Sequence, residues 1–187
     1  SILWLDDTID INLATGVNLV MDAGNAIFVN SNNQIQGSDG SVTLLAGNTL
    51  QAPTINTGGP IVIDSQSGDV SLQGNLSSNA AITIEAGGDI FSNPGHSIAS
   101  PVNDVVSLFA VGNIQAPDIF SEGTIKVESQ TGNIVLTGPV TADTSVELKA
   151  AGDISTGESL ISPGFLLDVT AETFLGSSVK DGFVLIN

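Results

Sequence analysis

The sequence predicts an all-β fold, a parallel β-helix built from three short strands per coil. Two observations predict it: the chain nearly repeats itself at a distance of 64 residues, and an apolar beat of about 21 residues runs inside each repeat. A third observation argues against helices, because no long stretch has a 3.6-residue apolar period and Gly recurs about every ten residues. At this coil length the 187 residues make roughly eight coils.

The long repeat indicates a duplication of three coils. "VTLLAGNTLQAPTI" (42–55) aligns with "VSLFAVGNIQAPDI" (106–119), and "SQSGDVSLQG" (65–74) aligns with "SQTGNIVLTG" (129–138). Residues 42–105 therefore correspond to residues 106–166, coil for coil. We expect residues 1–187 to form a single solenoid segment, an excerpt of a longer repeat protein.

The first strand of each coil is an apolar-x-apolar triplet. Successive triplets are 19, 21, 24, 19, 21 and 21 residues apart and begin at Val42, Ile61, Ile82, Val106, Ile125, Val146 and Leu167. Alternation of this kind places both apolar side chains of a triplet on one face of a strand. We expect the first six triplets to form a core column of Val42, Leu44, Ile61, Ile63, Ile82, Ile84, Val106, Leu108, Ile125, Val127, Val146 and Leu148.

The second and third strands follow in each coil after a turn. Their inward positions are predicted to be Leu50, Val70, Ile90, Ile114, Ile134 and Ile154, and then Ile55, Leu76, Ile98, Ile119, Val140 and Ile161. A β-sandwich of hairpins is the alternative, but two-residue Asn-Gly turns between matched strands are lacking. The spacing leaves open a coil of two strands and a left-handed winding.

Small residues mark the corner after the first strand. An alanine recurs there because a tight bend leaves little room, at Ala23, Ala46, Ala86, Ala110 and Ala150. We expect the glycines that follow to adopt positive φ, at Gly24, Gly68, Gly88, Gly112, Gly132 and Gly152.

Several of these stretches resemble a known class of repeat. "AGGDI" (86–90), "AAGDI" (150–154), "SGDVSLQG" (67–74), "TGNIVLTGPVTA" (131–142) and "ISPG" (161–164) are similar to the repeats of filamentous-haemagglutinin-type bacterial exoproteins. The resemblance covers about residues 17–173 and implies a right-handed β-helical rod exported by two-partner secretion. Members act as adhesins, biofilm components or toxin-carrying stalks. Only "NPG" (93–95) approaches the Asn-Pro-Asn motifs of the secretion domain, so a shaft segment is expected.

Composition restricts the partners. The net charge is −17, with three lysines, no arginine and twenty acids, so nucleic acid and anionic membrane are not expected to bind. There is no cysteine, and no apolar run approaches the length of a membrane span. We expect a secreted or cell-surface protein whose partners include host or neighbouring-cell surface glycans or proteins.

An Asn or Asp after each corner glycine forms the most regular polar column. Its members are Asn25, Asp69, Asp89, Asn113, Asn133 and Asp153. The interpretation we favour is a ladder in which each side chain bonds the backbone of its own turn. The alternative is a Ca²⁺-binding face with Asp69, Asp89 and Asp153 as ligands, since carboxylates suit a hard cation. No other cofactor is expected.

A carbohydrate-active enzyme is a further alternative. Its two carboxylates would come from adjacent coils, for example Asp64 and Glu85. The chain lacks the arginine that β-helical lyases use, and Lys126 and Lys149 are predicted to pair with Glu128 and Glu147. Further acids outside the polar column are Asp6, Asp7, Glu122, Glu158 and Asp168. We predict that the chain is not an enzyme.

The long excursions and the ends complete the prediction. Residues 31–40 and 92–104 are the expected sites for a binding loop, the second with the single histidine, His96, which cannot build a zinc site alone. Trp4 is predicted to pack into the core. "SILWLDD" and "GFVLIN" are apolar and strand-like, so further β-helical coils or protomers are expected to cover both ends. The predicted function is a structural and adhesive shaft, with a glycan- or Ca²⁺-binding module as the alternative.

Overall fold

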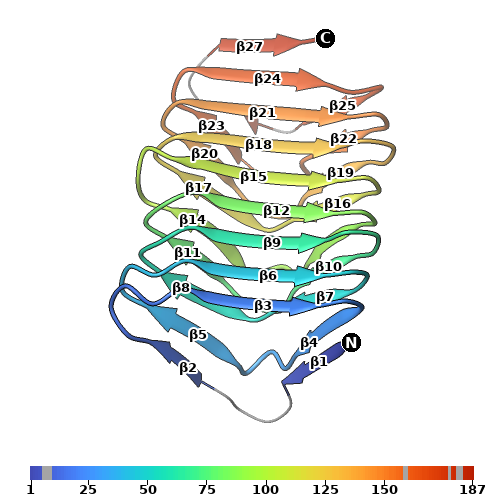
Figure 1. Cartoon of the computed structure of the whole chain (residues 1–187). Coiled ribbons are helices and arrows are strands. Elements are labelled where there is room, and N and C mark those ends of the chain that lie inside the picture. Colours follow the sequence, from blue (N-terminus) through green and yellow to red (C-terminus); the bar gives the residue numbers. More distant parts are fainter. Residues whose placement is uncertain (6–9, 158–159, 177, 180–182) are drawn as a thin grey trace.

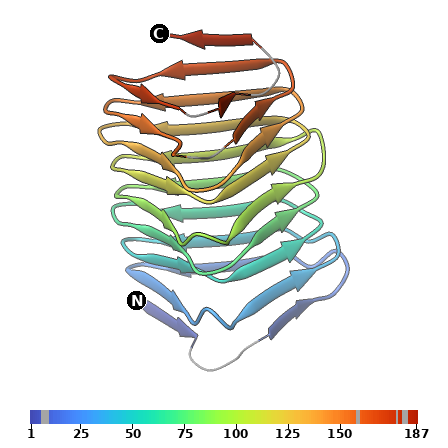
Figure 2. The same ribbon diagram turned by 180° about the vertical axis from the view of Figure 1, so that it is seen from behind.

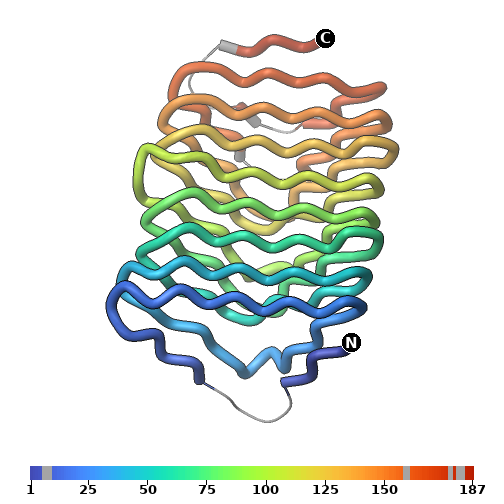
Figure 3. The backbone as a smooth tube through the Cα atoms, in the orientation of Figure 1, coloured from blue at the N-terminus to red at the C-terminus, as the bar shows by residue number. Residues whose placement is uncertain are grey.

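The chain winds into a right-handed parallel β-helix. The computed structural model describes residues 1–5, 10–157, 160–176, 178–179 and 183–187, and every regular element in these residues is a strand. In Figure 1 the front strands run from left to right, and the chain then passes behind and rises, which is a right-handed winding. The chain makes about eight coils of about 21 residues each. The backbone trace in Figure 3 shows the coils stacked along one axis. Asp6, Asp7 and Glu158 lie outside the described residues.

Three parallel sheets of nine strands each form the walls. Sheet I, at the front of Figure 1, contains β3 (Leu19–Ala23), β6 (Val42–Ala46), β9 (Ile61–Ser65), β12 (Ile82–Ala86), β15 (Val105–Ala110), β18 (Thr124–Ser129), β21 (Ser145–Ala150), β24 (Leu166–Thr170) and β27 (Phe183–Ile186). Sheet I includes one strand, β3, that lies before the first triplet recognised in the sequence. Its Leu19 and Met21 pair in register with Val42 and Leu44.

The other two sheets are seen best from behind, in Figure 2. Sheet II contains β1 (Ile2–Leu5), β4 (Ala26–Val29), β7 (Leu50–Ala52), β10 (Val70–Leu72), β13 (Ile90–Ser92), β16 (Ile114–Ala116), β19 (Ile134–Leu136), β22 (Ile154–Ser155) and β25 (Phe174–Leu175). Sheet III contains β2 (Asp10–Leu13), β5 (Gln34–Gly37), β8 (Thr54–Thr57), β11 (Leu76–Ser78), β14 (Ser97–Ser100), β17 (Asp118–Ser121), β20 (Val140–Ala142), β23 (Leu160–Pro163) and β26 (Ser178–Val179).

The core is a continuous column of aliphatic side chains. All twelve residues expected in the column of sheet I are buried, with exposed fractions of 0–1%. The register stacks like on like: Ile61 lies opposite Ile82, and Ile63 lies opposite Ile84. Sheets II and III contribute their inward positions to the same cluster. Each coil therefore buries its apolar face only against its neighbours, as a solenoid requires.

The expected conformation of the corner glycines is wrong. Positive φ occurs at Gly16, Gly95 and Gly157, and at none of the six corner glycines. A Cβ at Gly112 would instead collide with Asp89 Oδ1 of the preceding coil, and one at Gly152 would collide with Asn133 Oδ1. Glycine stands at these corners because the coil below fills the space of a side chain. Only Gly24 has room, with Ser1 at 3.6 Å.

The predicted core packing of Trp4 is also wrong. Trp4 and Ile2 are 63% and 60% exposed, whereas Leu3 and Leu5 of the same strand pack against the core. The cause is the register of β1 on β4, which places Leu3 opposite buried Ile27. With a period of two, the alternate residues must then face outward.

Candidate functional site

The polar column at the corner between sheets I and II is a ladder that crosses from coil to coil. Asp69 Oδ1 accepts a hydrogen bond of 2.8 Å from the backbone N–H of Asp89, and Asp89 Oδ1 accepts one of 2.5 Å from Asn113. Asn113 and Asn133 continue it, accepting from the next rungs at 3.0 and 2.7 Å. The partner is thus the following coil, and not the residue's own turn as the sequence analysis assumed.

The three candidate Ca²⁺ ligands are not brought together. Asp69 and Asp89 are adjacent rungs, but Asn113 and Asn133 stand between Asp89 and Asp153. Within the part of the chain that the structure describes, no group of three or more acidic, His or Cys side chains is arranged to hold a metal ion. The side-chain oxygens of Asp69, Asp89, Asn113 and Asn133 instead accept hydrogen bonds from backbone N–H groups of the following coil.

Asp64 and Glu85 do lie side by side. They are in register on β9 and β12, face outward, and line a shallow hollow of about 150 Å³ together with Phe109 and Gln66. This juxtaposition, which the coil length predicts, is confirmed. The two carboxylates are on an open sheet face, and their hollow is smaller than the roughly 300–1,000 Å³ of a usual small-molecule site.

Two lysines form cross-coil ion pairs on the outer face of sheet I. Lys126 Nζ lies 3.2 Å from Glu147, and Lys149 Nζ lies 2.7 Å from Glu128. The register of β18 on β21 places each lysine opposite its acid, so the pairing predicted between these four residues is confirmed. All four side chains are at least 39% exposed, which limits each pair to a small energetic contribution.

A second ladder, of buried hydroxyls, was not found from the sequence. It lies at the corner between sheets III and I, where Ser78 Oγ donates to the carbonyl of Gly59 at 2.7 Å and Ser121 Oγ donates to that of Asp104 at 2.8 Å. Each hydroxyl also accepts an N–H two residues ahead, from Ala80 to Ser78 at 3.0 Å. The sequence feature that could have predicted this ladder is a Ser or Thr as the last residue of the third strand in each coil from Thr57 to Ser121.

The two long excursions each contain a regular strand. Residues 31–40 include β5, and residues 92–104 include β14, so each contributes a regular strand to sheet III. His96 is half-buried in the turn before β14, and its Nδ1 has no hydrogen-bond partner among the described residues. This single histidine is not grouped with further metal-binding side chains of the described chain.

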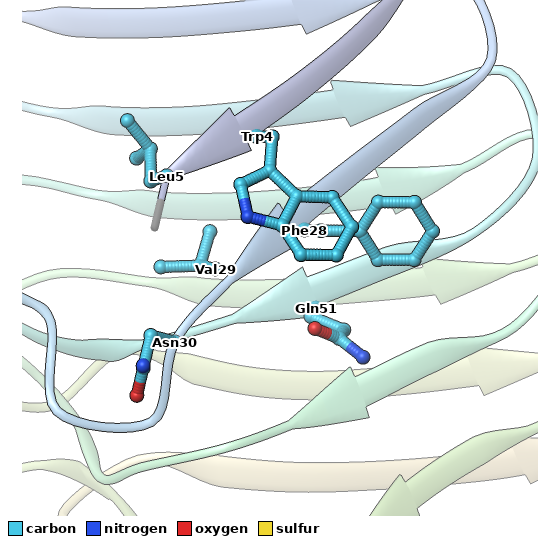
Figure 4. A pocket seen from close by; sticks show the side chains of 6 residues that line it. All are labelled: Trp4, Leu5, Phe28, Val29, Asn30 and Gln51. Carbon is cyan, nitrogen blue, oxygen red and sulfur yellow. The ribbon is translucent and has the colours of Figure 1, made fainter. Parts of the chain in front are cut away.

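An aromatic shelf lies on the outer face of sheet II and was missed in the sequence analysis. Trp4 stands opposite Phe28 in the register of β1 on β4, with ring centroids 5.1 Å apart and planes inclined by 49°. Figure 4 shows the two rings side by side, with Gln51 below them and Asn30 on the adjoining turn. Together with Leu5 and Val29 they line a hollow of about 120 Å³.

The chain matches no family model, no curated protein and no solved structure. Across the described residues, no helix is long and apolar enough to cross a membrane.

Proposed function

We propose that this chain is a structural and adhesive shaft segment of a secreted or cell-surface fibrous protein of the filamentous-haemagglutinin type. The observation that carries the proposal is the stack of coils: in the described residues, three sheets of nine parallel strands surround one apolar column. Such a stack has no separate lobes that could hinge, and it transmits load through the hydrogen bonds between coils. The role requires no catalysis.

The polar side chains support the same reading. The Asx ladder joins successive coils from Asp69 to Asp153, and the hydroxyl ladder joins coils at Ser78 and Ser121, so side-chain bonds cross between coils at two of the three corners. The hydroxyl bonds are buried or partly buried, and such bonds are costly to leave unmade, so they oppose slippage between coils. The resemblance of the repeats to those of exported adhesins points to the extracellular setting.

The proposal includes two kinds of partner: further β-helical coils, and a cell-surface molecule to which the shaft adheres. Strands β1 and β27 are edge strands of their sheets, and Leu185 and Ile186 of β27 are 48% and 60% exposed. Edge strands pair readily with further strands. We propose further coils or protomers at both ends, and a glycan or protein of a host or neighbouring cell as the adhesive target.

Force spectroscopy on the chain held between two marker domains tests the shaft role. We expect resolved unfolding steps that correspond to whole coils, each releasing about 70 Å of contour length for about 21 residues. Smooth extension at low force, without steps, would contradict a load-bearing role. A variant with Ile84→Ala in the middle of the column serves as a comparison and should lower the force of its own coil.

A further inference from the structure

We propose that Trp4, Phe28 and Gln51 form a binding shelf for a neutral sugar residue of a glycan. The proposal does not depend on the shaft role, because it rests on side chains that face away from the core. Trp4 is the most exposed large side chain of sheet II, at 63%. A large apolar ring held out toward water is unfavourable for folding alone, so its surface is available to a ligand.

The geometry suits one face of a pyranose ring. The inclined pair of rings offers an apolar surface on which the C–H groups of a sugar can pack, and an aromatic ring also attracts the weakly positive hydrogens of those groups. The hollow beside them, about 120 Å³, is too small to enclose a drug-sized ligand. It accommodates one unit of a longer chain that continues across the sheet.

Two amides stand ready beside the rings. Among the described residues the Gln51 side chain makes no hydrogen bond, and the Asn30 side chain uses only its Oδ1, which accepts from the backbone N–H of Asn32 at 3.1 Å. Gln51 and the Nδ2 group of Asn30 can therefore donate to sugar hydroxyls, and Gln51 can also accept from them. A few placed polar groups on an apolar surface are the usual means of orienting such a ligand.

Charge and backbone pairing select a neutral glycan over other partners. The two lysines that the structure describes lie on sheet I in ion pairs, so no described cation is present to hold a sulfate or a carboxylate. An extended peptide can add only to the open edge of β1, where it would lie beyond Trp4 and away from Phe28 and Gln51, because β4 and β7 are paired on both sides. The shelf therefore suits a ligand that offers hydroxyl and C–H groups, as a neutral sugar does.

The same sheet contains a natural comparison site. Three coils further along sheet II, Phe91 takes the position of Phe28. Ser71 lies opposite it in the position of Trp4, and Gln115 lies opposite it in the position of Gln51. There the Gln115 amide is already engaged, donating to the Ser92 carbonyl at 2.9 Å, and a serine replaces the tryptophan. The structure thus offers one complete shelf and one that lacks both the second ring and the free amide.

The single tryptophan of the chain makes the test direct. Trp4 emission would be followed while neutral tetrasaccharides of glucose, galactose, mannose and N-acetylglucosamine are added to the whole chain, each up to about 10 mM. We expect a saturable change with at least one of them. Gln51→Ala should weaken that binding about tenfold, and Phe28→Ala should weaken it further.

The matched control is Phe91→Ala, which should leave the titration unchanged, and circular dichroism would verify that each variant is folded. No emission change with any of the four sugars overturns the proposal, as does equal weakening by Phe91→Ala. Saturable binding of an apolar peptide in place of every sugar would identify the shelf as a protein-docking surface and overturn it too. A folded rod that unfolds in coil-sized steps but ignores sugars would leave the shaft role standing.

Discussion

At the corner between sheets I and II, the Asx side chain of one coil and the glycine of the next coil share the same small volume. Asp89 Oδ1 occupies the space where a Cβ of residue 112 would lie, and it accepts the N–H of Asn113. The glycine is therefore required by the neighbouring coil and not by its own backbone angles. This coupling explains why Gly and Asx recur together through the repeats.

A double-mutant cycle tests the coupling. Gly112→Ala should lower the free energy of unfolding by about 2 kcal/mol, because the new Cβ overpacks the corner. Asp89→Ala should cost about 1 kcal/mol for the lost hydrogen bond, and Gly112→Ala should cost much less in that background. Chemical denaturation measures all four proteins.

Gly24→Ala is the control for this cycle, since a Cβ there meets only ordinary contacts, and it should change stability by less than about 0.5 kcal/mol. Additive effects of Gly112→Ala and Asp89→Ala would show that the two positions do not compete.

At the scale of one strand, alternation separates stability from surface chemistry. In β12, Ile82 and Ile84 are fully buried, while Thr83 and Glu85 point outward beside the residues of the neighbouring coils. Changes at outward positions can therefore alter the face that the rod presents without disturbing the column. Along sheet I the outward residue in this register changes from Thr83 to Ser107 and Lys126, while the inward positions stay aliphatic.

Two substitutions in β12 make the point measurable. Ile84→Ala should destabilise the chain by about 2–5 kcal/mol, since it leaves a cavity in a column with no slack. Thr83→Ala, one residue away, should change the free energy of unfolding by less than about 0.5 kcal/mol. Similar losses from both in thermal and chemical denaturation would mean that the outward face also carries stability.

The ion pairs on the outer face of sheet I are expected to contribute little to stability, in contrast to the buried column. A double-mutant cycle on Lys126 and Glu147 should yield a coupling of about 0.2–1 kcal/mol, because both groups are well exposed. Raising the salt concentration should reduce it. A coupling above this range that is insensitive to salt would require a desolvated pair, which the exposure of these side chains argues against.

At the scale of the whole molecule, the charge of −17 is spread over a rod and repels itself. Only two described lysines offset it, both on sheet I. The column and the ladders must hold the coils together against this repulsion. Screening by salt should therefore stabilise the fold, in contrast to its effect on the individual ion pairs.

The melting temperature tests this balance. Raising NaCl from about 10 to 150 mM shortens the screening length from about 30 to 8 Å and should raise the melting temperature. CaCl2 at matched ionic strength should have the same effect as NaCl. Extra stabilisation by CaCl2 that is lost in Asp89→Asn would instead reveal a cation site at the Asx ladder, whose hydrogen bonds an asparagine can maintain.

The sequence by itself determined the coil. A strand that faces a continuous column must carry apolar residues at every second position, and a coil that stacks on its like must repeat at a constant length, so the pattern from Val42 to Leu167 contains the three-stranded solenoid. The neighbours Asp64 and Glu85 followed from the same coil length, and the two lysines and two acids of the ion pairs were recognised as partners without the sequence assigning each lysine to its acid.

Only the tertiary structure decided which residues of neighbouring coils contact each other. The partner of Asp89, the reason for Gly112 and the outward turn of Trp4 depend on the register of one coil on the next, which residue types within a single coil do not reveal. The same holds for the shelf, since Trp4, Phe28 and Gln51 belong to three successive coils. The hydrogen bonds of the two ladders join residues 17 to 24 positions apart, and stacking alone places them together.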